Sequence, residues 1–79
     1  MNDKIMNTPD DLLEALADLE HQQWMQWSQT VAPEVTQERQ QRWRNAWIPY
    51  GELSEEVKEQ DRVWARKILA ILRERKLIP

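Results

Sequence analysis

The chain of 79 residues has no cysteine, no phenylalanine and a single glycine. Without cysteine there can be no disulfide and no thiolate metal site, which suits a reducing cytoplasm, where we expect the protein to act. The scarcity of glycine argues against a loop-rich β fold and favours helices. No apolar run is long enough to cross a bilayer, so we expect no signal peptide and no membrane partner.

The net charge of −3 is unevenly distributed along the chain. Residues 1–32 carry six acids and one base, whereas residues 61–79 carry six bases and two acids. An acidic first helix and a basic last helix could attract each other, or the basic face could bind an anion. The negative overall charge argues against non-specific binding of nucleic acid.

Five of the six aromatic residues are tryptophans. Each can bury about 150–250 Å², so together they could form most of the core of so small a domain. Helical spacing assigns Trp24, Trp27 and Trp64 mainly to packing. Trp43 and Trp47 lie among arginines beside a turn, so for them the choice between core and binding surface stays open.

Capping residues and apolar repeats predict three helices, over about residues 8–30, 36–47 and 55–75. Thr8, Thr36 and Ser54 are the expected N-caps. The expected fold is an all-α three-helix single domain, with two long antiparallel helices and a short bridging helix. We place this domain at residues 8–79, preceded by a flexible arm at 1–7.

The stretch from Trp47 to Arg62 is where we expect a site. Pro49 and Gly51 stop the preceding helix, and an aromatic turn is followed by a charged helix start. This segment brings Trp47 and Tyr50 close in sequence to Lys58, Asp61 and Arg62.

Two acids interrupt apolar faces, Glu20 in the first long helix and Asp61 in the second. A carboxylate at such a position needs a partner, and the available ones are Arg44, Lys58, Arg62 and His21. A metal or acid–base cluster is weakly indicated, because there is one histidine and no HExxH spacing. A polar network that ties the two long helices together is the favoured interpretation.

Two parts of the sequence resemble the RyR domain, the module named after the ryanodine receptor. The first is LADLEHQQW, in which Glu20 and His21 are followed by Trp24. The second is the run WIPYGEL followed by Lys58, Asp61 and Arg62. The resemblance covers about residues 12–72. It implies a non-catalytic helical module that binds nucleotide-derived signals in prokaryotes, and in a phage a sponge that removes an immune signal from the host cytoplasm.

The function we expect is therefore capture of an anionic, nucleotide-like ligand, with no enzymatic step, cofactor or metal. The expected ligand-binding residues are Glu20, His21, Trp24, Arg44, Trp47, Tyr50, Lys58, Asp61 and Arg62. Trp47 and Tyr50 would stack on the base. Arg44, Lys58 and Arg62 would contact phosphate. The polar side chains of Glu20, His21 and Asp61 would orient sugar or base.

The alternative is a protein–protein interaction module that docks through exposed tryptophans, and an enzyme ranks a distant third. In either of the first two cases we expect a homo-oligomer, most simply a dimer, because so short a chain cannot easily bury every tryptophan.

Overall fold

The fold is taken from a computed structural model, and the structure describes residues 9–79. The predicted arm at residues 1–7 and the predicted cap at Thr8 lie outside the described residues. Within residues 9–79 the α-helices are α1 (Pro9–Val31), α2 (Gln37–Arg44) and α3 (Glu55–Glu74). Two 3-10 turns, at Ala32–Glu34 and Tyr50–Glu52, join them, and this part of the chain holds no strand. The all-α three-helix prediction is confirmed.

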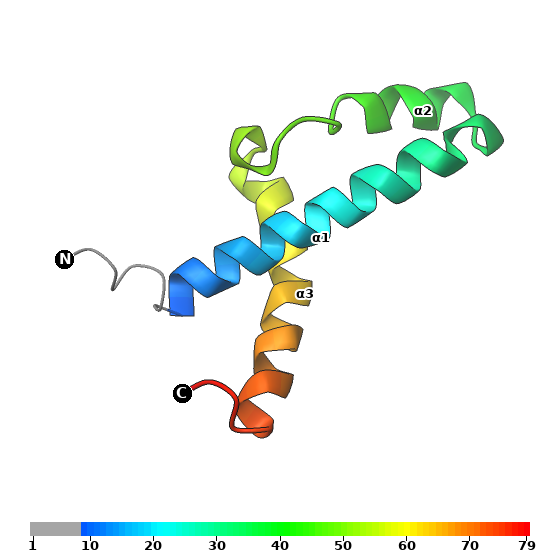
Figure 1. Cartoon of the computed structure of the whole chain (residues 1–79). Helices are drawn as coiled ribbons and strands as arrows, with labels where there is room; N and C mark the ends of the chain where they lie inside the picture. Colours follow the sequence, from blue (N-terminus) through cyan, green and yellow to red (C-terminus); the bar gives the residue numbers. More distant parts are fainter. Residues whose placement is uncertain (1–8) are drawn as a thin grey trace.

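The two long helices cross obliquely and run in opposite senses, while α2 folds back over the C-terminal half of α1 (Figure 1). The C-terminal half of α3 extends past α1 toward the end of the chain. The molecule measures 46 × 28 × 19 Å, with a radius of gyration of 15.1 Å. A compact domain of this length would have about 12 Å, so the fold is elongated.

Two of the expected helix caps are present. The Thr36 hydroxyl accepts a hydrogen bond from the Arg39 amide at 3.1 Å. The Ser54 hydroxyl accepts one from the Val57 amide at 3.3 Å. Each satisfies an amide that has no partner within the first turn of its helix, so α2 and α3 begin where the sequence predicts.

The last helix ends in a turn that glycine usually makes. Lys76 has a positive φ of 60°. The Lys76 amide donates to the Arg73 carbonyl at 2.9 Å, and the Leu77 amide donates to the Leu72 carbonyl at 2.8 Å. This pair of bonds is a Schellman motif, in which the residue just after the helix adopts the left-handed conformation.

The core is small and contains no tryptophan. Its buried members are Ala17, Tyr50, Leu53 and Ala65, with Leu13, Leu16, Ile48 and Val57 packed against them. One alanine comes from each long helix, and small side chains let the two helices approach closely where they cross.

The prediction that Trp27 and Trp64 are packing residues is wrong. Trp27 is 55% exposed and Trp64 is 56% exposed. On α3, Ala65 belongs to the core cluster, whereas its neighbour Trp64 is exposed. Trp24, by contrast, is half-buried.

Within residues 9–79 no helix combines the length and the apolar character that a membrane span requires.

Candidate functional site

A polar row on α1 holds the turn that precedes α3. Glu14, His21 and Ser28 are spaced seven residues apart, and this spacing puts them on one face of the helix. His21 and Ser28 are buried. Taken in the same order, the three side chains hydrogen-bond to Tyr50, to the carbonyl of Ile48 and to Trp47.

Two of these bonds show which ring nitrogen donates a proton. The His21 Nε2 lies 2.7 Å from the Ile48 carbonyl oxygen, which can only accept, so Nε2 carries a proton. The indole Nε1 of Trp47 donates to the Ser28 hydroxyl at 2.9 Å. Ser28 in turn donates to the Met25 carbonyl at 3.2 Å. Every buried polar side-chain atom in the described part of the chain has a hydrogen-bond partner.

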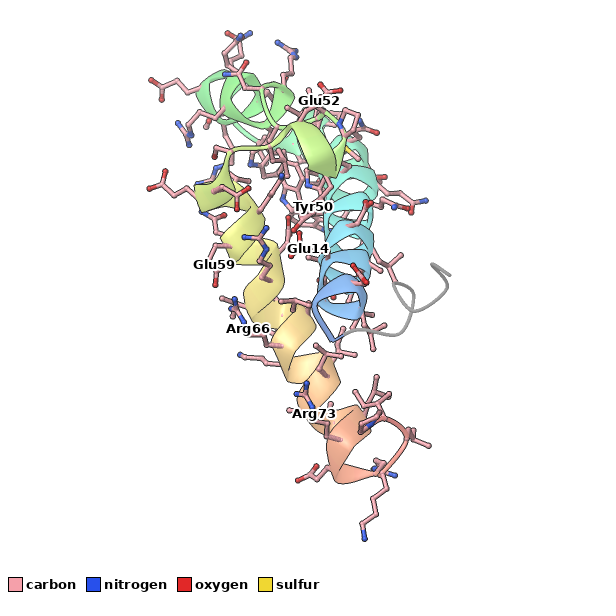
Figure 2. The ribbon with its side chains drawn as sticks, turned by 90° about the vertical axis from the view of Figure 1, so that its left-hand side faces the viewer. Glu14, Tyr50, Glu52, Glu59, Arg66 and Arg73 are labelled. Carbon is pink, nitrogen blue, oxygen red and sulfur yellow. The ribbon has the colours of Figure 1, made fainter. Side chains whose placement is uncertain are left out.

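Glu14 and Arg62 form the strongest polar link between the long helices. Arg62 donates to the Glu14 carboxylate through Nε at 2.6 Å and through Nη2 at 3.0 Å. Figure 2 shows Glu14 beside Tyr50, whose hydroxyl donates to the same carboxylate at 2.9 Å. The hydrogen bond from Arg62 lowers the pKa of Glu14, and burial together with the bond to Glu14 raises the pKa of Tyr50 to about 12.

The three cations expected to bind phosphate, Arg44, Lys58 and Arg62, do not share a pocket. Arg62 is held by Glu14 and also contacts Glu55 at 3.0 Å. Lys58 pairs with Glu55 at 3.4 Å and lies 5.5 Å from the centroid of the Tyr50 ring. Arg44 is exposed and bonds to the side chains of neighbouring glutamines on α2.

The structure therefore does not gather Arg44, Lys58 and Arg62 as free cations around Trp47 and Tyr50. Nearby carboxylates bind Lys58 and Arg62, and the Tyr50 side chain is buried with its hydroxyl bound to Glu14. Trp47 and Tyr50 instead border a shallow hollow of about 410 Å³ on the other side of the turn.

Four other expected residues do come together, in a half-open cavity of about 740 Å³ between the three helices. We call this cavity the tryptophan groove and define it by Glu20, His21, Trp24, Arg42, Trp43, Asp61 and Trp64. Glu20, His21 and Trp24 come from α1 and Asp61 from α3. Arg42, Trp43 and Trp64 also line the groove, although none of them was an expected ligand-binding residue and only for Trp43 did a binding surface stay open.

The aromatic rings of the groove form a connected series. His21 stacks on Trp24, with centroids 5.8 Å apart and planes at 19°. Trp24 and Trp43 meet at 77° with centroids 6.0 Å apart, so the two rings form a corner. Trp43 also contacts Trp27 at 5.7 Å, which extends the aromatic surface along α1 beyond the groove. Trp64 contributes from α3 and carries the ammonium of Lys67 4.3 Å from its ring centroid.

The two carboxylates of the groove are weakly compensated. The Asp61 side chain is 17% exposed, and the ring nitrogen Nδ1 of His21 lies 3.8 Å from its carboxylate, which is beyond hydrogen-bonding distance. Burial raises the pKa of Asp61, the charge of Glu20 raises it further, and His21 opposes the shift. Among residues 9–79, Glu20 makes no hydrogen bond and no ion pair.

The predicted network of Glu20, His21 and Asp61 is therefore not formed, and hydrogen bonds between Glu14 and Arg62 join the long helices instead. The sequence pattern that could have identified Glu14 is the seven-residue spacing that it shares with His21 and Ser28. Within the described part of the chain, no group of three His, Asp or Glu side chains could hold a metal ion.

Comparison of the chain with family models, curated proteins and solved structures gave no match, so the resemblance to the RyR domain stays a prediction.

Proposed function

We propose that the protein is a docking module whose tryptophan groove receives a segment of a partner protein. The observation that carries this proposal is the exposure of Trp27 and Trp64, at 55% and 56%, beside the half-buried rings of Trp24 and Trp43. Tryptophan is the residue most enriched where binding energy concentrates at protein interfaces. Large exposed apolar patches on small soluble domains are typical of such surfaces.

The free energy of removing tryptophan surface from water favours contact with a partner. Covering the exposed half of one tryptophan would remove roughly 100 Å² from water and contribute about 2–3 kcal/mol before the cost of association. Two such residues contribute enough to anchor a weak to moderate complex.

Capture of a nucleotide-like ligand is the second candidate. A cavity of about 740 Å³ is within the range of small-molecule sites, and Arg42 with the tryptophans could contact phosphate and base. Two carboxylates in the same lining oppose an anion, which is why this candidate ranks second. The dimer, the RyR assignment and the phage sponge stay predictions.

Affinity capture with matched variants tests the docking function. The full chain, the Trp27→Ala/Trp64→Ala variant and a Val63→Ala control would each be immobilised, after circular dichroism confirms equal helix content. Val63 is an exposed apolar residue of α3 that does not line the groove. A captured protein supports the docking function only if the Val63→Ala control retains it and the double variant loses it. Calorimetry must also show that the purified partner binds the full chain.

A panel of linear and cyclic nucleotides tests the second candidate. A ligand that binds only the folded chain raises its melting temperature. If a nucleotide raises it and the Trp24→Ala variant loses that shift, nucleotide capture replaces docking. If no partner depends on Trp27 and Trp64, the docking proposal is wrong.

A further inference from the structure

The tryptophan groove combines aromatic faces with negative charge. Its lining holds the carboxylates of Glu20 and Asp61 against one guanidinium, that of Arg42. With His21 counted as neutral, the lining carries a single net negative charge. Aromatic faces attract cations through the ring quadrupole, and carboxylates attract them directly.

Neither carboxylate is satisfied by the chain itself. Among the described residues Glu20 has no hydrogen bond and no ion pair, and Asp61 has only the histidine atom at 3.8 Å. Elsewhere the same chain binds its carboxylates closely, as with Glu14 to Arg62 at 2.6 Å and Glu59 to Arg66 at 2.6 Å. Because Glu20 and Asp61 lack such partners, the groove can accept one more cation.

We propose that the tryptophan groove binds the guanidinium group of an arginine side chain presented by the partner protein. The proposal rests on the docking function proposed above and names the chemistry of its anchor. The planar guanidinium would stack in the corner formed by Trp24 and Trp43, with its N–H groups directed at Glu20 and Asp61.

Arginine fits this site better than lysine. A guanidinium is flat, is weakly hydrated and stacks on aromatic faces while it donates to carboxylates in its own plane. The chain already places a cation on one of these rings, since the Lys67 ammonium lies 4.3 Å from the centroid of Trp64.

Acid should weaken this binding. Protonation of Asp61, whose pKa is raised chiefly by burial, removes one of the two charges that attract the cation. The charged groups that face Asp61 are His21 and Glu20 on α1, and Arg42 on α2 borders the same groove. Affinity is therefore expected to fall as the pH decreases through the raised pKa of Asp61.

Nuclear magnetic resonance of the five indole N–H groups tests the proposal with the full chain. The probes are three blocked tripeptides, Gly-Arg-Gly, Gly-Lys-Gly and Gly-citrulline-Gly, of which citrulline is the neutral isostere of arginine. The arginine peptide should shift the signals of Trp24, Trp43 and Trp64, with dissociation constants on the order of millimolar for so small a probe. The signal of Trp47, which is bound to Ser28, should not move.

Matched variants isolate the role of the charges. Asp61→Asn and Glu20→Gln should each weaken arginine binding about tenfold or more, as should the change from arginine to citrulline. Glu34→Gln removes an exposed carboxylate outside the groove and should leave binding unchanged. The proposal is overturned if citrulline binds as well as arginine, if the groove variants retain binding, or if inorganic phosphate shifts the groove signals and arginine does not. It is also overturned if those signals change with protein concentration alone, since a second copy would then fill the groove.

The two proposals fail in different ways. If a purified partner needs Trp27 and Trp64 but binds Asp61→Asn and Glu20→Gln as tightly as the unchanged chain, the docking function stands and the arginine anchor is wrong. If the arginine peptide binds and loses affinity in both variants, while no partner depends on the tryptophans, the cation site stands and the docking function is wrong.

Discussion

The carboxylate of Glu14 and the guanidinium of Arg62, 48 residues apart in the sequence, are joined by two hydrogen bonds of 2.6 and 3.0 Å. The same carboxylate accepts the hydroxyl of Tyr50. One acid on α1 thereby fixes both the start of α3 and the turn before it. This polar anchor leaves the tryptophans free of a structural role in joining the two long helices.

Glu14→Gln should destabilise the fold by about 1–2 kcal/mol at neutral pH. Hydrogen bonds to charged groups contribute about 1.5–3 kcal/mol, and the 42% exposure of the Glu14 side chain reduces that figure through solvent screening. Urea unfolding followed by circular dichroism gives the measurement. Because the pKa of Glu14 is lowered in the folded chain, its contribution is present above the unfolded pKa and is lost as the pH falls through the folded one.

Glu59→Gln is the control for this change. Glu59 pairs with Arg66 on the exposed side of α3 and lies only 3.6 Å from Arg62, so its loss should destabilise the fold less than the loss of Glu14 (Figure 2). Equal losses in the two variants would show that Glu14 is an ordinary surface acid and that the anchor does not hold the helices.

Ser28→Ala should cost about 1–3 kcal/mol, because it leaves the indole N–H of the half-buried Trp47 without an acceptor. In a Trp47→Phe background the same change should cost clearly less, since phenylalanine has no donor to satisfy. A double-mutant cycle by chemical unfolding measures this coupling. Additive losses would mean that the bond contributes nothing.

The fold should lose stability in alkali through Tyr50. The folded pKa of Tyr50 is raised to about 12 from 10.0, chiefly by burial and then by its bond to Glu14. Its contribution is fully present below pH 10 and is lost as the pH rises toward 12. Unfolding free energies measured between these pH values should fall more steeply for the natural chain than for Tyr50→Phe. Parallel curves would contradict the assignment.

Lys76→Gly should stabilise the chain by about 0.5–1 kcal/mol, because glycine adopts the positive φ of this helix end without the steric cost that lysine bears. Ala70→Gly, in the exposed interior of α3, is the matched control and should destabilise by about 1 kcal/mol. Thermal unfolding distinguishes the two. Destabilisation in both variants would show that the Schellman turn is not populated in solution.

Much of the fold could be predicted because helix ends depend on local chemistry. Thr36 and Ser54 act within a few residues of sequence, and α2 and α3 begin directly after them, whereas α2 ends at Arg44, before the predicted end at Trp47. The position of the tryptophans could not be predicted this way. Apolar spacing marks a stripe on a helix, but which side of the stripe is buried depends on the crossing near Ala17 and Ala65, which involves residues far apart in sequence.

The candidate site likewise contains residues that the sequence could predict and residues that it could not. Glu20, His21 and Asp61 were expected together because two acids interrupt apolar faces that must meet, and all three line the groove. Trp43 and Arg42 reach it only because α2 folds back over α1, an arrangement that no short-range pattern specifies (Figure 1). The sequence places Arg62 close to the turn, but no local pattern indicates that Glu14, 48 residues away, binds it.

Trp27 and Trp64 form an open surface and are not part of the core. Paramagnetic relaxation of the five indole N–H signals by a soluble gadolinium chelate, measured on the dilute full chain, tests it directly. We expect strong relaxation for Trp27 and Trp64, intermediate values for Trp24 and Trp43, and the weakest effect for Trp47. Protection of Trp27 and Trp64 equal to that of Trp47 would contradict the account.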